Sequence, residues 1–232
     1  MKKLGIIGAM TVEVALLKEN MEAMQVSNHA GMEFCQGKLC GMDTVVVQCG
    51  VGKVNAAMCA QILCSVYGVT HLVNTGIAGS LNADLDIGDL VVSKDAMYHD
   101  FDCVHFGYEM GKVPGMDVVA FPADEKMMEL AFAAAEAVNS GHTKVGRVAS
   151  GDLFVARKEA KEAIIEKTGA FCTEMEGAAI AQTAYRNRVP FVILRAISDK
   201  ADDSAEMDYP TFEAIAAKRC ANVAMNLAKN LA

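Results

Sequence analysis

Short apolar runs alternate with longer segments of helical spacing along most of this chain of 232 residues. Strands are expected at residues 4–8, 44–48, 71–74, 89–93, 144–149 and 191–195, and helices at 12–24, 54–67, 125–138, 178–188 and 211–231. Hydrophobicity within the expected strands is continuous, which is typical of strands that are covered on both faces. The alternation therefore predicts an α/β fold in three layers, with a mostly parallel central β-sheet flanked by helices.

Two segments depart from this alternation. Residues 32–48 have turns at Gly37 and Gly41 and are expected to form antiparallel strands at one edge of the sheet. Residues 98–122 show no clear periodicity and contain several aromatic side chains, a pattern typical of loops that are functional or that pack against a partner. Neither segment resembles a linker, so we expect residues 1–232 to form a single domain.

The charge and composition argue against several classes of protein. A net charge of -8 and a pI of about 5.1 leave no concentrated basic stripe, so we expect a small-molecule partner and no nucleic acid. The eight cysteines form no CxxC pair and no Cys/His cluster at metal-ligand spacing, so no metal is expected. This cysteine usage, and a start that leads directly into a strand, predict a cytoplasmic protein. No apolar run approaches the roughly 20 residues that cross a bilayer, so no membrane partner is expected.

Carboxylates beside the expected strands are the first candidates for chemistry. Glu13 follows the first strand at the start of a helix, where stabilisation of the helix dipole would also explain an acidic residue. Glu174 and Glu176 precede the helix at 178–188, and in an extended backbone only one of them can face a site. Glu176 could accept both hydroxyls of a ribose, or the pair could simply stand at a helix N-terminus.

Asp199 closes the most apolar of the expected strands. Burial there would raise its pKa and allow a protonated acid near neutral pH, although Ser198 and Asp199 are also good helix caps. Arg195, at the end of the same strand, would pair with one of the acids. Carboxyl groups of this kind suit catalysis through a sugar-derived cation, where one acid protonates the leaving group.

Three further junctions carry glycines. Residues 49–53 and 74–79 are expected to be glycine turns after strands, but neither completes a dinucleotide fingerprint or a P-loop. A nicotinamide-dependent dehydrogenase is therefore disfavoured. The third junction is residues 150–155, which follow a strand. Phe154 there could stack on a purine while free backbone groups bind the edge of the base, although a Phe at such a position is more commonly buried in the core.

Taken together, these motifs resemble the bacterial 5'-methylthioadenosine/S-adenosylhomocysteine nucleosidases over nearly the whole chain. In chain order they read GIIGAM (5–10) followed by Glu13, GVGK (50–53), NTGIAG (74–79), YHD (98–100), FGY (106–108), SGD (150–152), EME (174–176) and RAISD (195–199). The resemblance implies the nucleoside phosphorylase-like fold, which has a central mixed β-sheet surrounded by helices. It also implies a homodimer.

The resemblance assigns roles residue by residue. Asp199 would protonate adenine N7 and Glu13 would activate a water, while Glu176 would bind the ribose above Met175 and Arg195 would lie near the water. Phe154 would stack on adenine and the main chain of Val155 would read its edge. The other implied substrate contacts are Met10, Val51, Ala78, Gly79 and Ser198, with Phe106, Tyr108 and Pro114 closing the pocket of the neighbouring subunit.

The implied reaction is hydrolysis of an adenosine derivative to adenine and a thioribose product, without a cofactor, in methionine salvage. Many members of the family have Ser where this chain has Ile77, so a possible hydroxyl contact beside Glu13 is absent. This difference implies altered activity and not its loss. Phosphorylases of the superfamily clamp phosphate with arginines and a serine on the turns after early strands, and here that clamp is missing. Two alternatives stay open: hydrolysis of aminodeoxyfutalosine, and a non-catalytic nucleoside-binding protein.

Overall fold

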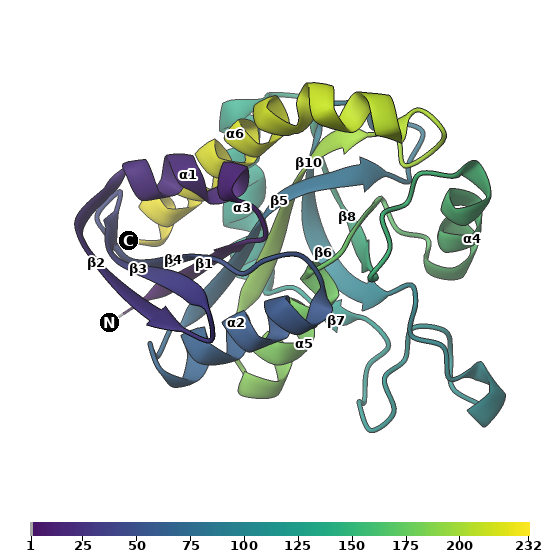
Figure 1. The fold of residues 1–232 in the computed structure, drawn as a ribbon, viewed down its shortest axis with the longest axis horizontal. Helices are drawn as coiled ribbons and strands as arrows, with labels where there is room; N and C mark the ends of the chain where they lie inside the picture. Colours follow the sequence, from purple (N-terminus) through teal and green to yellow (C-terminus); the bar gives the residue numbers. More distant parts are fainter. Residues whose placement is uncertain (1) are drawn as a thin grey trace.

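A mixed sheet of ten strands runs through the molecule between two layers of helices (Figure 1). The computed structural model describes residues 2–232, apart from the side chains at 206 and 207. The strands are β1 (Leu4–Gly8), β2 (Met21–His29), β3 (Met32–Leu39), β4 (Met42–Gln48), β5 (His71–Ser80), β6 (Leu90–Tyr98), β7 (Phe121–Pro122), β8 (Thr143–Ser150), β9 (Cys172–Glu174) and β10 (Phe191–Asp199). The helices are α1 (Thr11–Glu19), α2 (Lys53–Ser65), α3 (Glu125–Val138), α4 (Lys158–Thr168), α5 (Gly177–Asn187) and α6 (Ala205–Leu231), with a 3-10 turn, η1, at Val104–Phe106.

The sheet is parallel at its centre and closes partly on itself. Parallel pairs join β4 to β1, β1 to β5, and β5 to β10, and antiparallel β3 and β2 extend the edge beyond β4. On the other side, β10 pairs with β6, β6 with β8, β8 with β9, and β9 returns to the end of β5. These five strands form a closed ring, in which β5 and β10 run in one direction and β6, β8 and β9 in the other.

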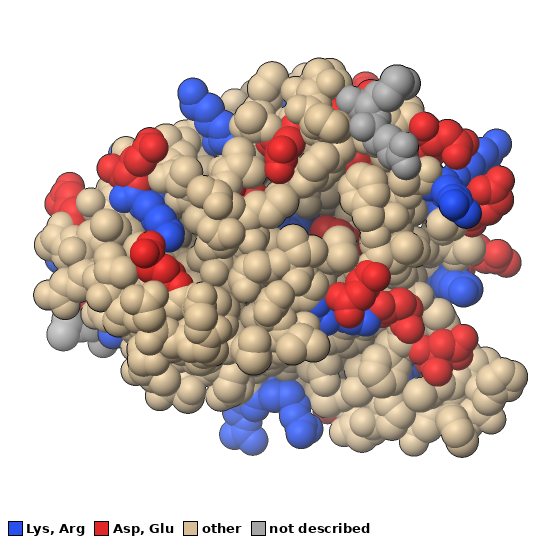
Figure 2. All heavy atoms as spheres, in the orientation of Figure 1, with Lys and Arg blue, Asp and Glu red and all other residues tan. Residues whose placement is uncertain are grey.

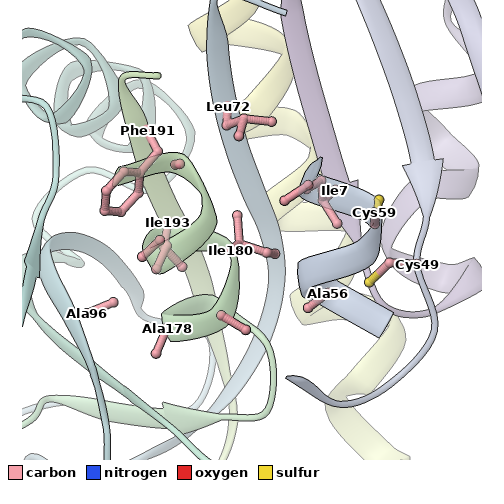
Figure 3. Packing of buried hydrophobic residues seen from close by; sticks show 14 of the residues in the cluster. Ile7, Cys49, Ala56, Cys59, Leu72, Ala96, Ala178, Ile180, Phe191 and Ile193 are labelled. Atoms are coloured by element: carbon pink, nitrogen blue, oxygen red, sulfur yellow. The ribbon is translucent and has the colours of Figure 1, made fainter. Parts of the chain in front are cut away.

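Two apolar cores lie on opposite faces of the sheet. Helices α1, α3 and α6 cover one face, with side chains such as Leu17 and Leu227 in its core, and α2 and α5 cover the other. Figure 3 shows this second core, in which Ile180 of α5, Cys59 of α2 and Leu72 of β5 belong to one cluster. Most of the eight cysteines are buried as free thiols. In the described part of the chain, no helix is both long and apolar enough to cross a membrane.

The three-layer α/β architecture and the antiparallel edge strands are confirmed, but several element boundaries were wrong. The first helix ends at Glu19 and not at residue 24, because Asn20 caps it and the chain turns into edge strand β2. The last helix begins at Ala205, before residue 211, and contains Pro210. The start of this helix was missed because a proline is unfavourable inside a helix, so Pro210 argued against helix at residues 205–210.

Near the strand ends, one local expectation was wrong and one alternative is excluded. Residues 74–79 form no turn, since β5 continues to Ser80 and its glycines lie within the strand. Asp199 does not cap a helix, because β10 continues to that residue and the N-cap of α6 is Ser204. Strands β7 and β9 and helix α4 were not expected from the sequence, the first two because two or three residues carry no usable periodicity.

Candidate active site

A cavity of about 330 Å³ opens at the carboxyl ends of the parallel strands. That edge is where open α/β sheets place their ligands. The cavity is lined by Ala9, Met10, Glu13, Val51, Ile77, Ala78, Gly79, Leu153, Phe154, Val155, Thr173, Glu174, Met175, Glu176, Ser198, Asp199 and Tyr209. Its volume suits a small ligand of nucleoside size.

Glu13, the third residue of α1, is held by three backbone N–H groups. Its Oε2 accepts hydrogen bonds from Ala9 N at 2.6 Å and Met10 N at 3.0 Å, and its Oε1 accepts one from Ile77 N of β5 at 3.1 Å. Burial raises the pKa of Glu13, while the charge of Arg195 and the N–H donors oppose this rise. The helix-dipole interpretation agrees with the position of Glu13 in the first turn of α1, but the hydrogen bond from Ile77 N of β5 also fixes the carboxylate at the cavity wall.

Asp199 lies at the last position of β10 and is almost fully buried. Its Oδ2 accepts a hydrogen bond from Ser198 Oγ at 2.8 Å, and its Oδ1 accepts one from Ala201 N at 2.8 Å. Burial raises the pKa of Asp199 despite these donors, and the nearby charges of Asp208 and Asp202 act in the same direction. The expected shift toward a protonated carboxyl is present.

A buried cluster of charges lies between β9 and β10. The Glu174 carboxylate accepts hydrogen bonds from Ser150 Oγ, from Arg195 Nη2 and from Gly177 N. Glu176 lies farther from the guanidinium, with 3.9 Å between its Oε2 and Arg195 Nη2, and accepts a hydrogen bond from Gly52 N at 2.8 Å. Burial and the charge of Glu174 raise the pKa of Glu176 to about 7.

Aromatic side chains form another wall of the cavity. Phe154 leaves 47% of its surface exposed and contacts Tyr209 edge to face, with 5.5 Å between the ring centroids. The Tyr209 hydroxyl lies 3.2 Å from Met10 Sδ and 3.2 Å from Glu213 Oε1. Such a half-open ring can stack on a planar base.

The structure brings most of the expected site residues together. Glu13, Glu176 and Asp199 line one cavity, with the other expected contacts Met10, Val51, Ala78, Gly79, Phe154, Val155, Met175 and Ser198. Arg195 does not line it, because its guanidinium is buried behind the wall against Glu174 and Asn74. Phe106, Tyr108 and Pro114 do not line it either, and they belong to the segment between β6 and β7, parts of which project from the body at the lower right of Figure 1.

Sequence reasoning missed other lining residues. Glu174 was considered only as the partner of Glu176, and its role in neutralising Arg195 depends on a contact between two strands that no local pattern reveals. Tyr209 lies in a segment that was not expected to be helical, so nothing placed its ring near the first helix. A search for aromatic residues shortly after Asp199 would have found it.

Comparisons with known proteins agree with this arrangement. The chain matches the Phosphorylase superfamily over residues 3–229. A 5'-methylthioadenosine/S-adenosylhomocysteine nucleosidase of Oceanobacillus iheyensis is 38% identical over 229 residues, which cover 98% of this chain and 99% of that protein. The solved structure of the corresponding Neisseria meningitidis nucleosidase, in complex with methylthio-immucillin-A, has a TM-score of 0.96 at 35% identity and covers 99% of this chain and 100% of that one. A futalosine hydrolase of Helicobacter pylori has a TM-score of 0.93 at 31% identity and covers 99% of this chain and 98% of that one.

The match to the family model over residues 3–229 places the chain in the phosphorylase superfamily. The 38% identity to a single nucleosidase over 98% of this chain identifies the family within that superfamily. The chain belongs to the 5'-methylthioadenosine/S-adenosylhomocysteine nucleosidase family.

Proposed function

We propose that this protein hydrolyses the N-glycosidic bond of 5'-methylthioadenosine and S-adenosylhomocysteine, and also that of 5'-deoxyadenosine, with release of adenine. The observation that carries the proposal is that Glu13, Glu176 and Asp199, far apart in the sequence, line one nucleoside-sized cavity. Binding alone does not require a buried acid beside two further carboxylates, so a non-catalytic nucleoside-binding protein is disfavoured.

Asp199 is the proposed general acid. Because its pKa is raised, its protonated form can persist toward neutral pH and give its proton to adenine N7. The C1'–N9 bond then breaks, its electron pair moves onto the purine, and the base leaves as a neutral molecule. Phe154 stacks on the adenine and the main chain of Val155 binds its edge.

Glu13 is the proposed base for the attacking water. The water forms the new C1'–O bond and gives its proton to Glu13, while Glu176 accepts hydrogen bonds from the ribose hydroxyls. The carboxylates also stabilise the positive charge that develops on the sugar. Arg195 acts through Glu13, because its charge favours the ionised carboxylate from behind the wall. The remaining proposed substrate contacts are Met10, Val51, Ala78, Gly79, Met175 and Ser198.

The charge of the cavity favours water over phosphate as the nucleophile. Among the described residues, those that line it include Glu13, Glu174 and Glu176 besides the proposed acid Asp199, and no Lys or Arg. The one guanidinium nearby, Arg195, already binds Glu174. A phosphate dianion entering this cavity would meet net repulsion, whereas a neutral water would not.

The active form is proposed to be a homodimer in the cytoplasm that serves methionine salvage. Phe106 is 82% exposed on its projecting loop, and Val54 and Met58 of α2 are also exposed. Figure 2 shows few charged side chains over α2. A second copy that buries these side chains would bring Phe106, Tyr108 and Pro114 over the neighbouring cavity, where they would cover the 5'-substituent.

The test is adenine release from the three nucleosides, with and without added phosphate. We expect release that does not depend on phosphate and that falls by about 10²-fold or more in Asp199→Asn, the contribution of a general acid. Asp203→Asn, which changes an exposed acid nearby, serves as the control and is expected to keep full activity. A strict requirement for phosphate would overturn the hydrolase assignment, and full activity of Asp199→Asn would remove Asp199 from its role.

Aminodeoxyfutalosine is the second candidate substrate, because a futalosine hydrolase shares the fold over the whole chain. It shares the adenine and ribose contacts of the other nucleosides and differs at the 5' end. The same adenine assay with this compound decides between them, since the preferred substrate will have the highest kcat/KM.

A further inference from the structure

Asp152 connects three loops around the cavity without lining it. Its Oδ1 accepts a hydrogen bond from Lys53 N at 2.9 Å, and its own N–H donates to Asp100 Oδ2 at 2.9 Å. Lys53 Nζ lies 2.5 Å from Asp100 Oδ2 and 3.6 Å from Asp152 Oδ2. The loops after β4, β6 and β8 therefore meet at this cluster.

The contact with Lys53 completes the start of α2. Gly52 is the N-cap of this helix and provides no side chain, so Asp152 supplies the missing carboxylate from a different part of the sheet. A carboxylate at a helix N-terminus satisfies an otherwise unpaired N–H and interacts favourably with the helix dipole. The exposed ion pair with Lys53 contributes much less, because solvent screens it.

The start of α2 in turn holds a residue of the proposed sugar site. Gly52 N donates to Glu176 Oε1 at 2.8 Å, and Gly52 has a φ of +98°. A Cβ at Gly52 would lie 3.2 Å from Asp152 Oδ1, so the two loops are in close contact. On its other side, Asp152 is two residues from Phe154 in the aromatic wall.

We propose that Asp152 is a positioning residue, which holds the start of α2 so that Gly52 N–H binds Glu176 and which links this contact to the loop that carries Phe154. The role of Glu176 as the ribose ligand rests on the proposed function. The geometric link between Asp152, Gly52 and Glu176 does not.

The hydrogen bond from Gly52 N–H also affects the pKa of Glu176, whose carboxylate several other groups face. Glu174 of β9 and Glu13 of α1 disfavour its charge, as does burial, whereas Arg195 of β10 and Gly52 N–H favour it. The Cys49 thiol after β4 lies near enough for its own pKa to be raised by Glu176, after the larger effect of burial. If Gly52 moves away, Glu176 loses a donor to its charged form, and its pKa rises further.

The experiment compares four variants. Asp152→Ala and Asp152→Leu remove the acceptor, whereas Asp152→Asn keeps an oxygen for Lys53 N–H and loses only the charge. Asp43→Ala is the matched control, because it removes a Lys–Asp pair with Lys38 at 2.9 Å on a remote hairpin. Circular dichroism establishes that each variant is folded, and kcat and KM for 5'-methylthioadenosine are measured from pH 5 to 9.

For Asp152→Ala and Asp152→Leu we expect kcat/KM to fall roughly tenfold, mostly through KM, as for the loss of one hydrogen bond to a charged group. The acidic limb of the kcat/KM profile should move to higher pH by about half a unit or more. Asp152→Asn should stay within about twofold of wild type, and Asp43→Ala should be unchanged. Wild-type values and profiles for both acceptor-free variants would overturn the proposal, as would a loss in Asp152→Asn equal to theirs.

A titration that needs no turnover separates this proposal from the proposed function. Carbon-13 NMR of protein labelled at Glu carboxyl carbons follows Glu176 directly, with its signal assigned from Glu176→Gln. The Glu176 pKa should be higher in Asp152→Ala than in wild type, and an unchanged pKa would overturn the positioning role. If wild type released no adenine, the function would fail, while this titration would still decide the role of Asp152.

Discussion

At the scale of residues, the centre of the site is one buried guanidinium among three buried carboxylates. Burial alone would lower the pKa of Arg195, but the charges of Glu174, Glu13 and Glu176 outweigh it and raise the pKa. Glu174 takes the closest contact, which leaves Glu176 with only a distant share of the positive charge. The protein therefore holds more negative charge here than stability alone would favour.

Glu176→Gln should reveal the cost of that charge. The pKa of Glu176 is about 7 in the folded state and 4.5 in an unperturbed glutamate, so between these pH values the folded state binds more protons than the unfolded state. Stability of the wild type is then lost as pH rises through this window, by up to about 3 kcal/mol. Glu176→Gln should lack this loss, and urea unfolding at pH 4.5 and pH 8 measures it.

The exposed Glu19→Gln on α1 is the control for this measurement. It should follow the wild-type dependence on pH. Equal dependence in wild type and Glu176→Gln would contradict the raised pKa. Activity of Glu176→Gln should fall in parallel, since an amide cannot accept two ribose hydroxyls as a carboxylate does.

The sequence predicted the carboxylates of the cavity because each stands beside a recognisable strand or within a specific motif. It could not predict which acid would neutralise Arg195. That choice depends on the pairing of β8 with β9, which places Ser150 beside Glu174, and on the distance between β9 and β10. Contacts of this kind are set by strand order, which a single sequence does not encode locally.

At the scale of elements, β5 contributes most to the site, because it pairs with β1, β9 and β10. Its length was underestimated, since Gly76 and Gly79 look like a turn in the sequence. Gly76 is needed inside the strand for space: a Cβ there would collide with Arg195 Nη1 and Glu13 Oε1. A glycine within a strand that approaches buried side chains so closely is a packing requirement.

Gly76→Ala should therefore destabilise the fold by about 3 kcal/mol, because neither buried charged group can move aside into water. Gly141→Ala is the comparison, since Gly141 has a φ of +76° and open space around its Cα. That change should cost only about 1 kcal/mol, from backbone strain. Thermal and urea unfolding of both variants measure the difference, and a Gly76→Ala protein as stable as Gly141→Ala would show that the site relaxes easily.

At the scale of the whole molecule, the cavity of one chain opens beside a face with exposed apolar side chains. Val51 and Phe154 line the cavity and are about half exposed, and Val54 lies on α2 just beyond. From the sequence, the aromatic loop was expected either to be functional or to pack against a partner, and in the structure Phe106 of this loop is exposed. Exposed apolar side chains gathered on one face are typical of a surface that contacts another protein chain.

If a second copy covers this face, wild type should sediment at twice the 24.7 kDa of one chain. Phe106→Asp should weaken that association, because a charge would be buried in an apolar contact, and adenine release per chain should then fall on dilution by roughly tenfold or more. Phe132→Asp, at a partly exposed Phe of α3, is the control and should change neither property. Analytical ultracentrifugation and activity across the same range of concentrations measure both, and a fully active wild-type monomer would show that each cavity is complete within its own chain.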